Sequence, residues 1–321
     1  MHKIWFERTM PTHFAPLLEG VAVEIGPSSV TPNDPLSTLS QADAIVATSV
    51  MVYDAAIMDK APQLKIISRT GIGYDKVSIP AATERGIAVC NAPDGPTIST
   101  AEHAVALMMG VAKNVKQAEN RLRAGGTKDF FKNHVGLELY QAQLGLVGLG
   151  RIGGHVAKIA LALGMKVVAY DPYITSEQAD KLGVKQAATL EALLATADVV
   201  SLHLPLNENN RQLMNTERIA QMKPGAILVN TSRGGLVDES ALLGALESGH
   251  LFGAGLDVTD PEPAQPDNPL LHREDVIVTP HVAAATKAGK NRIYEIAITQ
   301  VLQLLRGKRP PHLVNPEVWK D

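Results

Sequence analysis

Three polar side chains in the second half of the chain could carry out acid–base chemistry on an anionic substrate. His281 follows a Thr-Pro pair, and an imidazole exchanges a proton near neutral pH. Glu262 lies between two prolines, and a carboxylate beside an imidazole favours its protonated form. Arg233 precedes two glycines, and its planar guanidinium can bind a carboxylate through two hydrogen bonds. Taken singly, each of these residues could have a purely structural role. Taken together, they predict a proton donor and a carboxylate-binding group.

A glycine-rich turn at residues 148–153 reads Gly-Leu-Gly-Arg-Ile-Gly, with an apolar run before it and an amphipathic run after it. This pattern predicts a strand, a tight turn and a helix. In such a unit Gly148 permits the turn, Gly150 lets the backbone approach a pyrophosphate, and Gly153 lets the helix pack on the strand. A second apolar run ends in Asp171, where an acid can bind a ribose 2′-hydroxyl. The unit therefore predicts a dinucleotide site rather than another kind of glycine turn.

The elements that must position these groups alternate between strands and helices. The predicted strands are 3–6, 21–25, 44–47, 64–67, 87–90, 144–147, 166–170, 197–204, 227–231, 253–258 and 276–279, with turn signals at 26–29 and 32–35. Such alternation indicates parallel sheets with helices on both faces. Ligands of open α/β sheets bind off the carboxyl ends of the strands. The polar groups that follow the last three strands are therefore expected to gather over a cofactor.

Two long helices are predicted at about 100–123 and 288–306, and the residues between 124 and 139 read as a loop or arm. The single cysteine, Cys90, lies in an apolar run and is interpreted as a buried core residue rather than a nucleophile.

Composition restricts the class of protein. A chain of 321 residues exceeds what one core usually supports, so two domains are expected. A net charge of −3 and an aromatic content of 4% argue against a nucleic-acid partner. No apolar run reaches membrane-spanning length, and the first residues lack a signal-peptide pattern. One cysteine fits a reducing compartment. We therefore expect a cytoplasmic protein without a membrane partner, and no metal site is predicted.

Several ordered motifs resemble the D-2-hydroxyacid dehydrogenase family, and the likeness covers nearly the whole chain. The motifs are the glycine turn at 145–153, the arginine segment at 230–238, the acidic segment at 255–263, the Thr-Pro-His of 279–281, and the first-half segments 69–75 and 96–103. The resemblance implies an α/β fold of two Rossmann-like, doubly wound parallel-sheet domains. A dinucleotide-binding domain at 103–285 would be inserted in a flavodoxin-like substrate domain made of 1–102 and 286–321, with the two long helices as the hinge.

The resemblance also implies roles for individual residues. The implied catalytic set is Arg233, Glu262 and His281. The implied cofactor-binding residues are Gly148, Gly150, Arg151, Ile152, Gly153, Asp171, His203, Pro205, Thr231, Ser232, Asp257 and Thr97, with Asp257 facing the nicotinamide. The implied substrate-binding residues are Arg69, Thr70 and Gly71, with the backbone N–H groups of the last two receiving the substrate carboxylate.

The implied activity is an NAD-dependent interconversion of a D-2-hydroxy acid and a 2-keto acid by hydride transfer, with His281 as the acid/base. Asp171 favours NAD over NADP, because a carboxylate repels a 2′-phosphate. Members of the family are commonly homodimers through the inserted domain. The substrate and the physiological direction stay open.

Two alternatives remain at this point. Arg69 could bind a second anionic group, as in a 3-phosphoglycerate dehydrogenase-type activity, or it could be a surface arginine at a strand end. The chain could also be an NAD-binding, corepressor-like protein without metabolic turnover.

Overall fold

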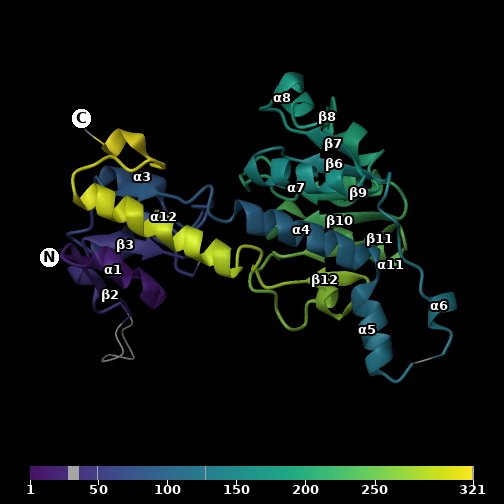
Figure 1. Cartoon of the computed structure of the whole chain (residues 1–321), viewed down its shortest axis with the longest axis horizontal. Helices are drawn as coiled ribbons and strands as arrows, with labels where there is room; N and C mark the ends of the chain where they lie inside the picture. Colours follow the sequence, from purple (N-terminus) through teal and green to yellow (C-terminus); the bar gives the residue numbers. More distant parts are fainter. Residues whose placement is uncertain (28–35, 49, 127, 320–321) are drawn as a thin grey trace. The chain divides into compact units, whose positions relative to one another are not determined.

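The computed structural model describes residues 1–27, 36–48, 50–126 and 128–319, so the turn predicted at 32–35 lies outside the described residues. The chain divides into two compact units (Figure 1). Unit 1 contains Met1–Pro96 and Thr286–Asp321, and unit 2 contains Thr97–Ala285. The boundary predicted after residue 102 falls inside a helix, α4 (Thr97–Ala112), which belongs to unit 2 from its first residue.

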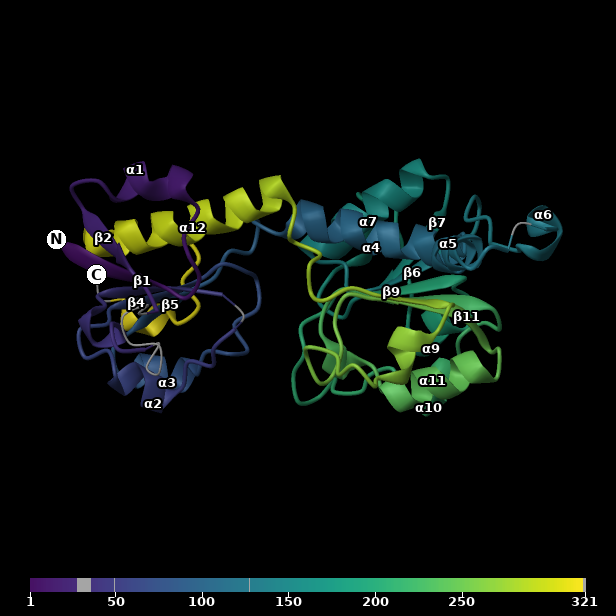
Figure 2. The same ribbon diagram turned by 90° about the horizontal axis from the view of Figure 1, so that it is seen from below.

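Unit 1 is built on a five-stranded parallel sheet of order β2-β1-β3-β4-β5. Its strands are β1 (His2–Phe6), β2 (Ala22–Ile25), β3 (Ala44–Ala47), β4 (Ile66–Arg69) and β5 (Ala88–Cys90). Neighbouring side chains along a strand face opposite sides. Phe6 and Val46 therefore pack with the long helix α12 (Lys287–Leu305), whereas Trp5 and Ile45 pack on the other face (Figure 2).

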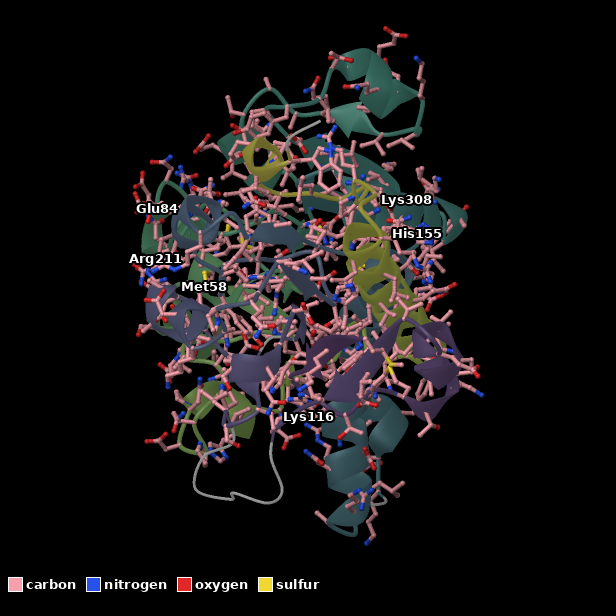
Figure 3. The ribbon with its side chains drawn as sticks, turned by 90° about the vertical axis from the view of Figure 1, so that its left-hand side faces the viewer. Met58, Glu84, Lys116, His155, Arg211 and Lys308 are labelled. Carbon is pink, nitrogen blue, oxygen red and sulfur yellow. The ribbon has the colours of Figure 1, made fainter. Side chains whose placement is uncertain are left out.

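The second face of this sheet is covered by α2 (Ala55–Asp59) and α3 (Ile79–Glu84). Met58 of α2 is 2% exposed, whereas Glu84 at the end of α3 is exposed (Figure 3). Cys90 is a free, buried thiol, and burial raises its pKa to about 12. The prediction of a core cysteine is confirmed.

Unit 2 is built on a seven-stranded parallel sheet of order β12-β11-β10-β9-β6-β7-β8. Its strands are β6 (Gln143–Val147), β7 (Lys166–Tyr170), β8 (Lys185–Gln186), β9 (Val199–Leu202), β10 (Ala226–Asn230), β11 (Leu251–Leu256) and β12 (Val276–Val278). The chain runs outward from β6 to β8 and then returns to β9 on the other side of β6. This reversal of strand order between β6 and β9 creates a crevice at their carboxyl ends.

Helices cover both faces of the second sheet (Figure 2). α4 and α7 (Arg151–Ala162) lie on one face, and α9 (Leu190–Leu194), α10 (Thr216–Ala220) and α11 (Glu239–Glu247) lie on the other. Other short helices are α1 (Ala15–Leu18), α8 (Ser176–Asp180) and the 3-10 turns Thr12–Phe14, Leu39–Gln41, Gly234–Leu236, Pro269–His272 and Pro316–Val318. The predicted class of two doubly wound parallel sheets is confirmed. No helix in the described part of the chain is both long and apolar enough to cross a membrane.

The helix predicted at 100–123 is wrong, because the chain forms two helices there. α4 ends at Ala112, and α5 (Val115–Arg123) follows a break at Asn114, whose φ is 49°. Asparagine tolerates this left-handed conformation better than most residues. Its side chain also donates to the carbonyl of Val135 (2.6 Å). The apolar stripe stops with α4, since α5 has no buried residue.

The segment predicted as a loop or arm between 124 and 139 is not wholly irregular. It contains a short helix, α6 (Phe130–Asn133).

Candidate active site

The glycine turn joins β6 to the first residue of α7. Gly148 has a φ of 97°, which residues with a side chain rarely adopt. A Cβ atom at Gly153 would lie 2.2 Å from the carbonyl oxygen of Gly148, so only glycine allows this contact between helix and turn. A Cβ atom at Gly150 would meet nothing within 4 Å. The turn is therefore closed toward the sheet and open beyond Gly150, where the first N–H groups of α7 can receive an anion.

Asp171 follows β7, the strand next to β6, and its carboxylate is bound to the glycine turn. Oδ2 accepts a hydrogen bond from the backbone N–H of Leu149 (2.8 Å), and Oδ1 accepts one from Tyr173 (2.9 Å). These bonds place the acid beside the turn that would bind a pyrophosphate. A carboxylate oxygen has two lone pairs, so each can still accept a second donor from a ligand.

Two buried polar atoms at the carboxyl ends of β9 and β10 have no hydrogen-bond partner among the described residues. They are Nδ1 of His203 and Oγ1 of Thr231. His203 Nε2 contacts the hydroxyl of Ser201 (2.9 Å), and burial lowers the pKa of His203 to about 4. Buried polar atoms without partners are uncommon in native proteins. Their place beside the strand-order reversal fits a polar ligand that completes their hydrogen bonds.

The other cofactor-binding residues implied by the sequence are also in unit 2. Ser232 donates its hydroxyl to the carbonyl of Leu202 (2.7 Å). Thr97 is the first residue of α4, and Arg151 and Ile152 are the first residues of α7, where the N-terminal amides lie. Pro205, beyond the end of β9, is exposed.

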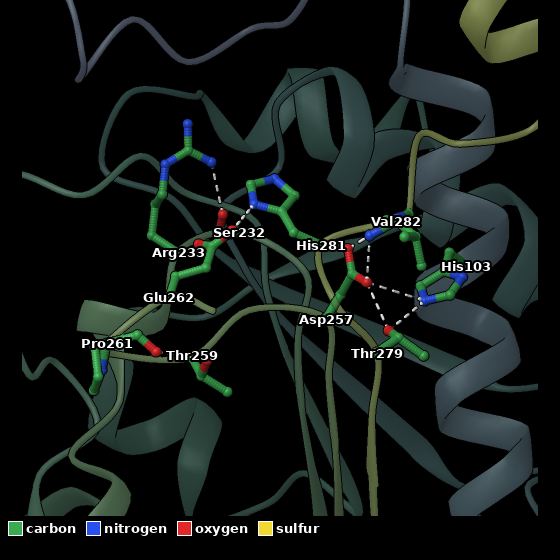
Figure 4. Close-up of polar contacts among 11 residues, drawn as sticks. His103, Ser232, Arg233, Asp257, Thr259, Pro261, Glu262, Thr279, His281 and Val282 are labelled. Carbon is green, nitrogen blue, oxygen red and sulfur yellow. Dashed lines mark hydrogen bonds and ion pairs between the residues drawn. The ribbon is translucent and has the colours of Figure 1, made fainter. Parts of the chain in front are cut away.

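His281 and Glu262 form a hydrogen-bonded pair at the carboxyl ends of two neighbouring strands (Figure 4). Glu262 follows β11, and His281 follows β12. Because the carboxylate is the acceptor, the imidazole Nδ1 donates, which leaves Nε2 as the nitrogen that can exchange a proton with a substrate. Both side chains are partly exposed, at 36% for His281 and 40% for Glu262. The pair is therefore accessible to a small molecule.

Arg233 follows β10, and its turn packs tightly on the loop that carries Glu262. Asn230 donates its side-chain amide to the carbonyl of Arg233 (2.8 Å). The guanidinium donates to the carbonyl of Ser232 (2.7 Å). A Cβ atom at Gly234 would lie 2.0 Å from the carbonyl oxygen of Thr259, so this close approach requires glycine. The loop of Arg233 thus lies against the loop that carries Glu262, the partner of His281.

Asp257, at the end of β11, is fully buried and accepts hydrogen bonds on both carboxylate oxygens. The donors are the hydroxyl of Thr279 (2.6 Å) and the backbone N–H groups of Val282 and Ala283 (both 2.9 Å). Burial raises the pKa of this carboxyl, but hydrogen bonds from His103, Thr279 and the two amides outweigh burial and leave the pKa below its usual value. Asp257 is therefore ionised, and both of its carboxylate oxygens already accept hydrogen bonds from the protein.

Sequence reasoning missed His103, which lies on α4 beside Asp257. Its Nε2 is 2.9 Å from Thr279 Oγ1 and 3.5 Å from Asp257 Oδ1. The available signal was a histidine among the small and apolar residues of α4. Its partners were not predictable, because they lie on the last two strands of the sheet, far away in the sequence.

The residues predicted to bind the substrate lie in unit 1, at the end of β4. Arg69 is only 6% exposed and its Nε donates to the carbonyl of Gly73 (3.2 Å), so the alternative of a surface arginine is wrong. The predicted use of the Thr70 N–H is also wrong, because this group donates to the carbonyl of Ala47 (2.9 Å). It continues the pairing of β4 with β3 and is not available to a ligand.

The carbonyl groups of the turn after Thr70 are all held by donors of the protein. The carbonyl of Gly71 accepts from the backbone N–H of Ala92 (2.9 Å), and that of Ile72 accepts from the side chain of Asn91 (2.8 Å). Arg69 holds the carbonyl of Gly73. Because the N–H of a peptide points opposite to its carbonyl, the N–H groups of residues 72–74 are directed away from these donors.

Comparisons with known proteins agree with this architecture. Residues 105–283 match the family model described as D-isomer specific 2-hydroxyacid dehydrogenase, NAD binding domain. The D-3-phosphoglycerate dehydrogenase of Archaeoglobus fulgidus is 42% identical over 273 residues, which are 85% of this chain and 51% of that protein. The glyoxylate reductase of Korarchaeum cryptofilum is 40% identical over 287 residues, which are 89% of this chain and 86% of that protein.

A solved structure, the TT0316 protein from Thermus thermophilus, superimposes with a TM-score of 0.89 at 40% identity, covering 97% of this chain and 99% of that one. The chain spans about half the length of the phosphoglycerate dehydrogenases that it matches. The family model covers more than half of the chain, and the glyoxylate reductase is covered over most of its length. The chain therefore belongs to the D-isomer specific 2-hydroxyacid dehydrogenase family, and residues 105–283 are its NAD-binding domain.

Proposed function

We propose that this protein is an NAD-dependent oxidoreductase that interconverts a D-2-hydroxy acid and the corresponding 2-keto acid. The observation that carries the proposal is the His281–Glu262 pair, formed at adjacent strand ends of an NAD-binding domain. A histidine with one nitrogen held by a carboxylate and the other available is suited to exchange a proton with a substrate oxygen.

NAD supplies the hydride chemistry when it is bound. The protein supplies charge and proton transfer to the substrate. In the direction of reduction, Arg233 binds the carboxylate of the keto acid and polarises its ketone oxygen. His281 gives the proton on Nε2 to that oxygen, and Glu262 stabilises the imidazolium before the transfer. In the direction of oxidation, His281 takes the proton from the hydroxyl.

The turn at 71–73 is our candidate for the second carboxylate-binding group. Its carbonyls are held by Ala92, Asn91 and Arg69, so successive N–H groups point the other way. Such a run of amides can bind an anion. This assignment leaves out the N–H of Thr70, which donates to Ala47, and adds the N–H groups of residues 72–74 to that of Gly71.

The described residues fit an NAD site. The pyrophosphate would lie at Gly150, Arg151 and Ile152, above the packing contact of Gly153 with Gly148. Asp171 would bind the adenosine ribose, and its charge disfavours the 2′-phosphate of NADP.

The buried atoms of His203 and Thr231 that lack partners among the described residues lie where the cofactor would continue toward the last strands. We extend the proposed site to the neighbouring Pro205 and Ser232, and to Thr97. Asp257 is proposed to border the nicotinamide.

A small, singly charged 2-keto acid is the favoured substrate class. It is favoured because the match covers 86% of the length of the glyoxylate reductase, but only 51% of the length of the Archaeoglobus fulgidus phosphoglycerate dehydrogenase. The second candidate, a 3-phosphoglycerate dehydrogenase-type activity, would need Arg69 to bind a second anionic group. The burial of Arg69 and its hydrogen bond to Gly73 support a structural role instead.

We also propose a cytoplasmic homodimer. Exposed apolar side chains gather on the segment from α5 to β6, and they are Val115, Leu122, Phe131, Val135 and Tyr140. A second copy of unit 2 could cover them. The single buried cysteine is compatible with a reducing compartment.

The test is turnover of a keto-acid panel with NADH, with glyoxylate, hydroxypyruvate, pyruvate, a bulky 2-keto acid and phosphohydroxypyruvate. His281→Asn should lower kcat about 10²- to 10⁴-fold and leave NADH affinity nearly intact. Arg233→Lys should raise the KM for the keto acid, because the planar fork is lost.

If the wild-type protein turns over no keto acid, the proposed dehydrogenase activity is refuted and a corepressor-like role is favoured. Full activity of His281→Asn would exclude it as the acid/base. A preference for phosphohydroxypyruvate that is lost in Arg69→Ala would favour the phosphoglycerate alternative.

A further inference from the structure

His281 has an unusual backbone conformation for a residue with a side chain. Its φ is 53°, in the left-handed region. Such conformations persist where the surrounding contacts hold them in place, and they cluster at functional sites. The conformation determines the direction in which the imidazole leaves the chain. The contacts that hold it therefore bear on the His281–Glu262 pair.

Three consecutive backbone N–H groups around His281 all donate to a single residue, Asp257. The N–H of His281 donates to the Asp257 backbone carbonyl (2.7 Å) and, more weakly, to that of Thr279 (3.0 Å). The next two amides, of Val282 and Ala283, donate to Oδ1 and Oδ2 of the Asp257 side chain (both 2.9 Å) (Figure 4). The turn from 281 to 283 is thus hydrogen-bonded to Asp257 through three amides. Its backbone conformation therefore depends on how the buried carboxylate is oriented.

Besides these two amides, the carboxylate receives a directed chain of two hydrogen bonds from side chains. Thr279 Oγ1 lies 2.6 Å from Asp257 Oδ1, and because the carboxylate is ionised the threonine hydroxyl donates its only proton to it. The contact between His103 Nε2 and the same hydroxyl (2.9 Å) must then have the histidine as donor. His103 therefore carries a proton on Nε2, and the order of donation is His103 to Thr279 to Asp257.

We infer that His103 and Thr279 are positioning residues for His281, which act by orienting Asp257 so that its carboxylate holds the 281–283 turn. All of these residues belong to unit 2. The inference goes beyond the proposed catalytic set, and its kinetic test rests on the proposed function.

The substitutions come in matched pairs. His103→Leu removes the donor, whereas His103→Gln keeps an N–H near the position of Nε2. Thr279→Val removes the hydroxyl, and Thr279→Ser keeps it. His155→Leu, on α7 (Figure 3), serves as a control that changes a histidine outside this chain of hydrogen bonds.

The expected kinetic result is a split between kcat and cofactor affinity. His103→Leu and Thr279→Val should lower kcat for keto-acid reduction by about 10- to 100-fold, because a small misplacement of a catalytic group has a large effect on rate. Their NADH dissociation constants, measured by nucleotide fluorescence, should change less than about threefold. His103→Gln and Thr279→Ser should recover most of the loss. The double variant His103→Leu/Thr279→Val should be no slower than the slower single variant, since both break one chain.

A second measurement does not depend on activity. Amide hydrogen exchange of a peptide covering 279–285 should be faster in His103→Leu than in wild type, and close to wild type in His103→Gln and His155→Leu. If no keto acid is turned over but exchange follows this order, the proposed function fails and the positioning inference stands. Equal kcat in His103→Leu and wild type, equal losses in His103→Leu and His103→Gln, a parallel loss of NADH affinity, or unchanged exchange would each overturn the inference.

Discussion

His203 gives a quantitative prediction about stability and pH. Burial lowers its pKa from 6.5 to about 4. Its Nδ1 is buried without a partner among the described residues, so the protonated ring would leave a charged donor unsatisfied. Between these two pH values the unfolded chain binds a proton at His203 and the native protein does not. The free energy of unfolding contributed by this group is therefore fully present above about pH 6.5, and it is lost as the pH falls toward 4.

The size of the loss follows from the shift. A difference of about 2.5 units at about 1.4 kcal/mol per unit corresponds to about 3 kcal/mol between pH 7 and pH 4. This value is an upper limit, because the side chain as a whole is partly exposed even though Nδ1 is not. The variant His203→Gln lacks this titrating ring. Between pH 7 and pH 4 its free energy of unfolding should therefore fall by up to about 3 kcal/mol less than that of the wild type.

The assay is urea unfolding at several pH values without cofactor, since a bound ligand would add its own contribution. Far-UV circular dichroism reports the secondary structure of both units, so it includes the unfolding of unit 2, in which His203 follows β9. Both tryptophans, Trp5 and Trp319, lie in unit 1, so tryptophan fluorescence reports the other unit and should give the same pH dependence in both proteins. The exposed His13, replaced by glutamine, is the matched control. Identical pH dependence of wild type and His203→Gln in the circular dichroism transition would refute the reasoning.

Two further predictions concern the glycine turn and its acid. Gly153→Ala places a Cβ atom 2.2 Å from the carbonyl oxygen of the turn's first glycine, so it should cost about 1–3 kcal/mol in thermal or urea unfolding and weaken NADH binding more than about tenfold. Gly154→Ala meets only an ordinary contact at 3.7 Å and should be nearly neutral; equal effects of the two would contradict this account. Asp171→Ala should raise the KM for NADH about tenfold and increase the relative use of NADPH in initial-rate assays, and an unchanged cofactor ratio would argue against its ribose contact.

The order of strands and helices was largely predictable, because it depends on local patterns. The strands at 44–47 and 166–170 were predicted to the residue, and the last long helix within one residue at each end. Apolar runs of this length between turn residues have few other solutions. The break at Asn114 was not predictable in the same way. Helix-compatible residues continue through it, and the contact with Val135 that stabilises it comes from a later segment.

The substrate turn shows where motif resemblance reaches its limit. The glycines around Arg69 indicated an anion-binding turn with the N–H groups of Thr70 and Gly71, but the N–H of Thr70 is already used within the sheet. Which N–H is available depends on where the pairing of β4 with β3 stops, and Thr70 is still paired with Ala47. The exposure of Arg69 was likewise decided by the residues that pack around the strand end.

The sequence alone determined the parts whose chemistry is local. The turn has a φ of 97° at Gly148, and a Cβ atom at Gly153 would lie 2.2 Å from the Gly148 carbonyl oxygen, so both positions require glycine. The dinucleotide unit can therefore be predicted from consecutive residues. The tertiary structure decided which distant groups meet. His281 contacts Glu262, and His103 reaches Asp257 through Thr279, because the sheet order places β11 next to β12 and α4 against them. Hydrogen bonds act over about 3 Å, so these partnerships exist only once the sheet has brought residues far apart in the sequence to the same edge.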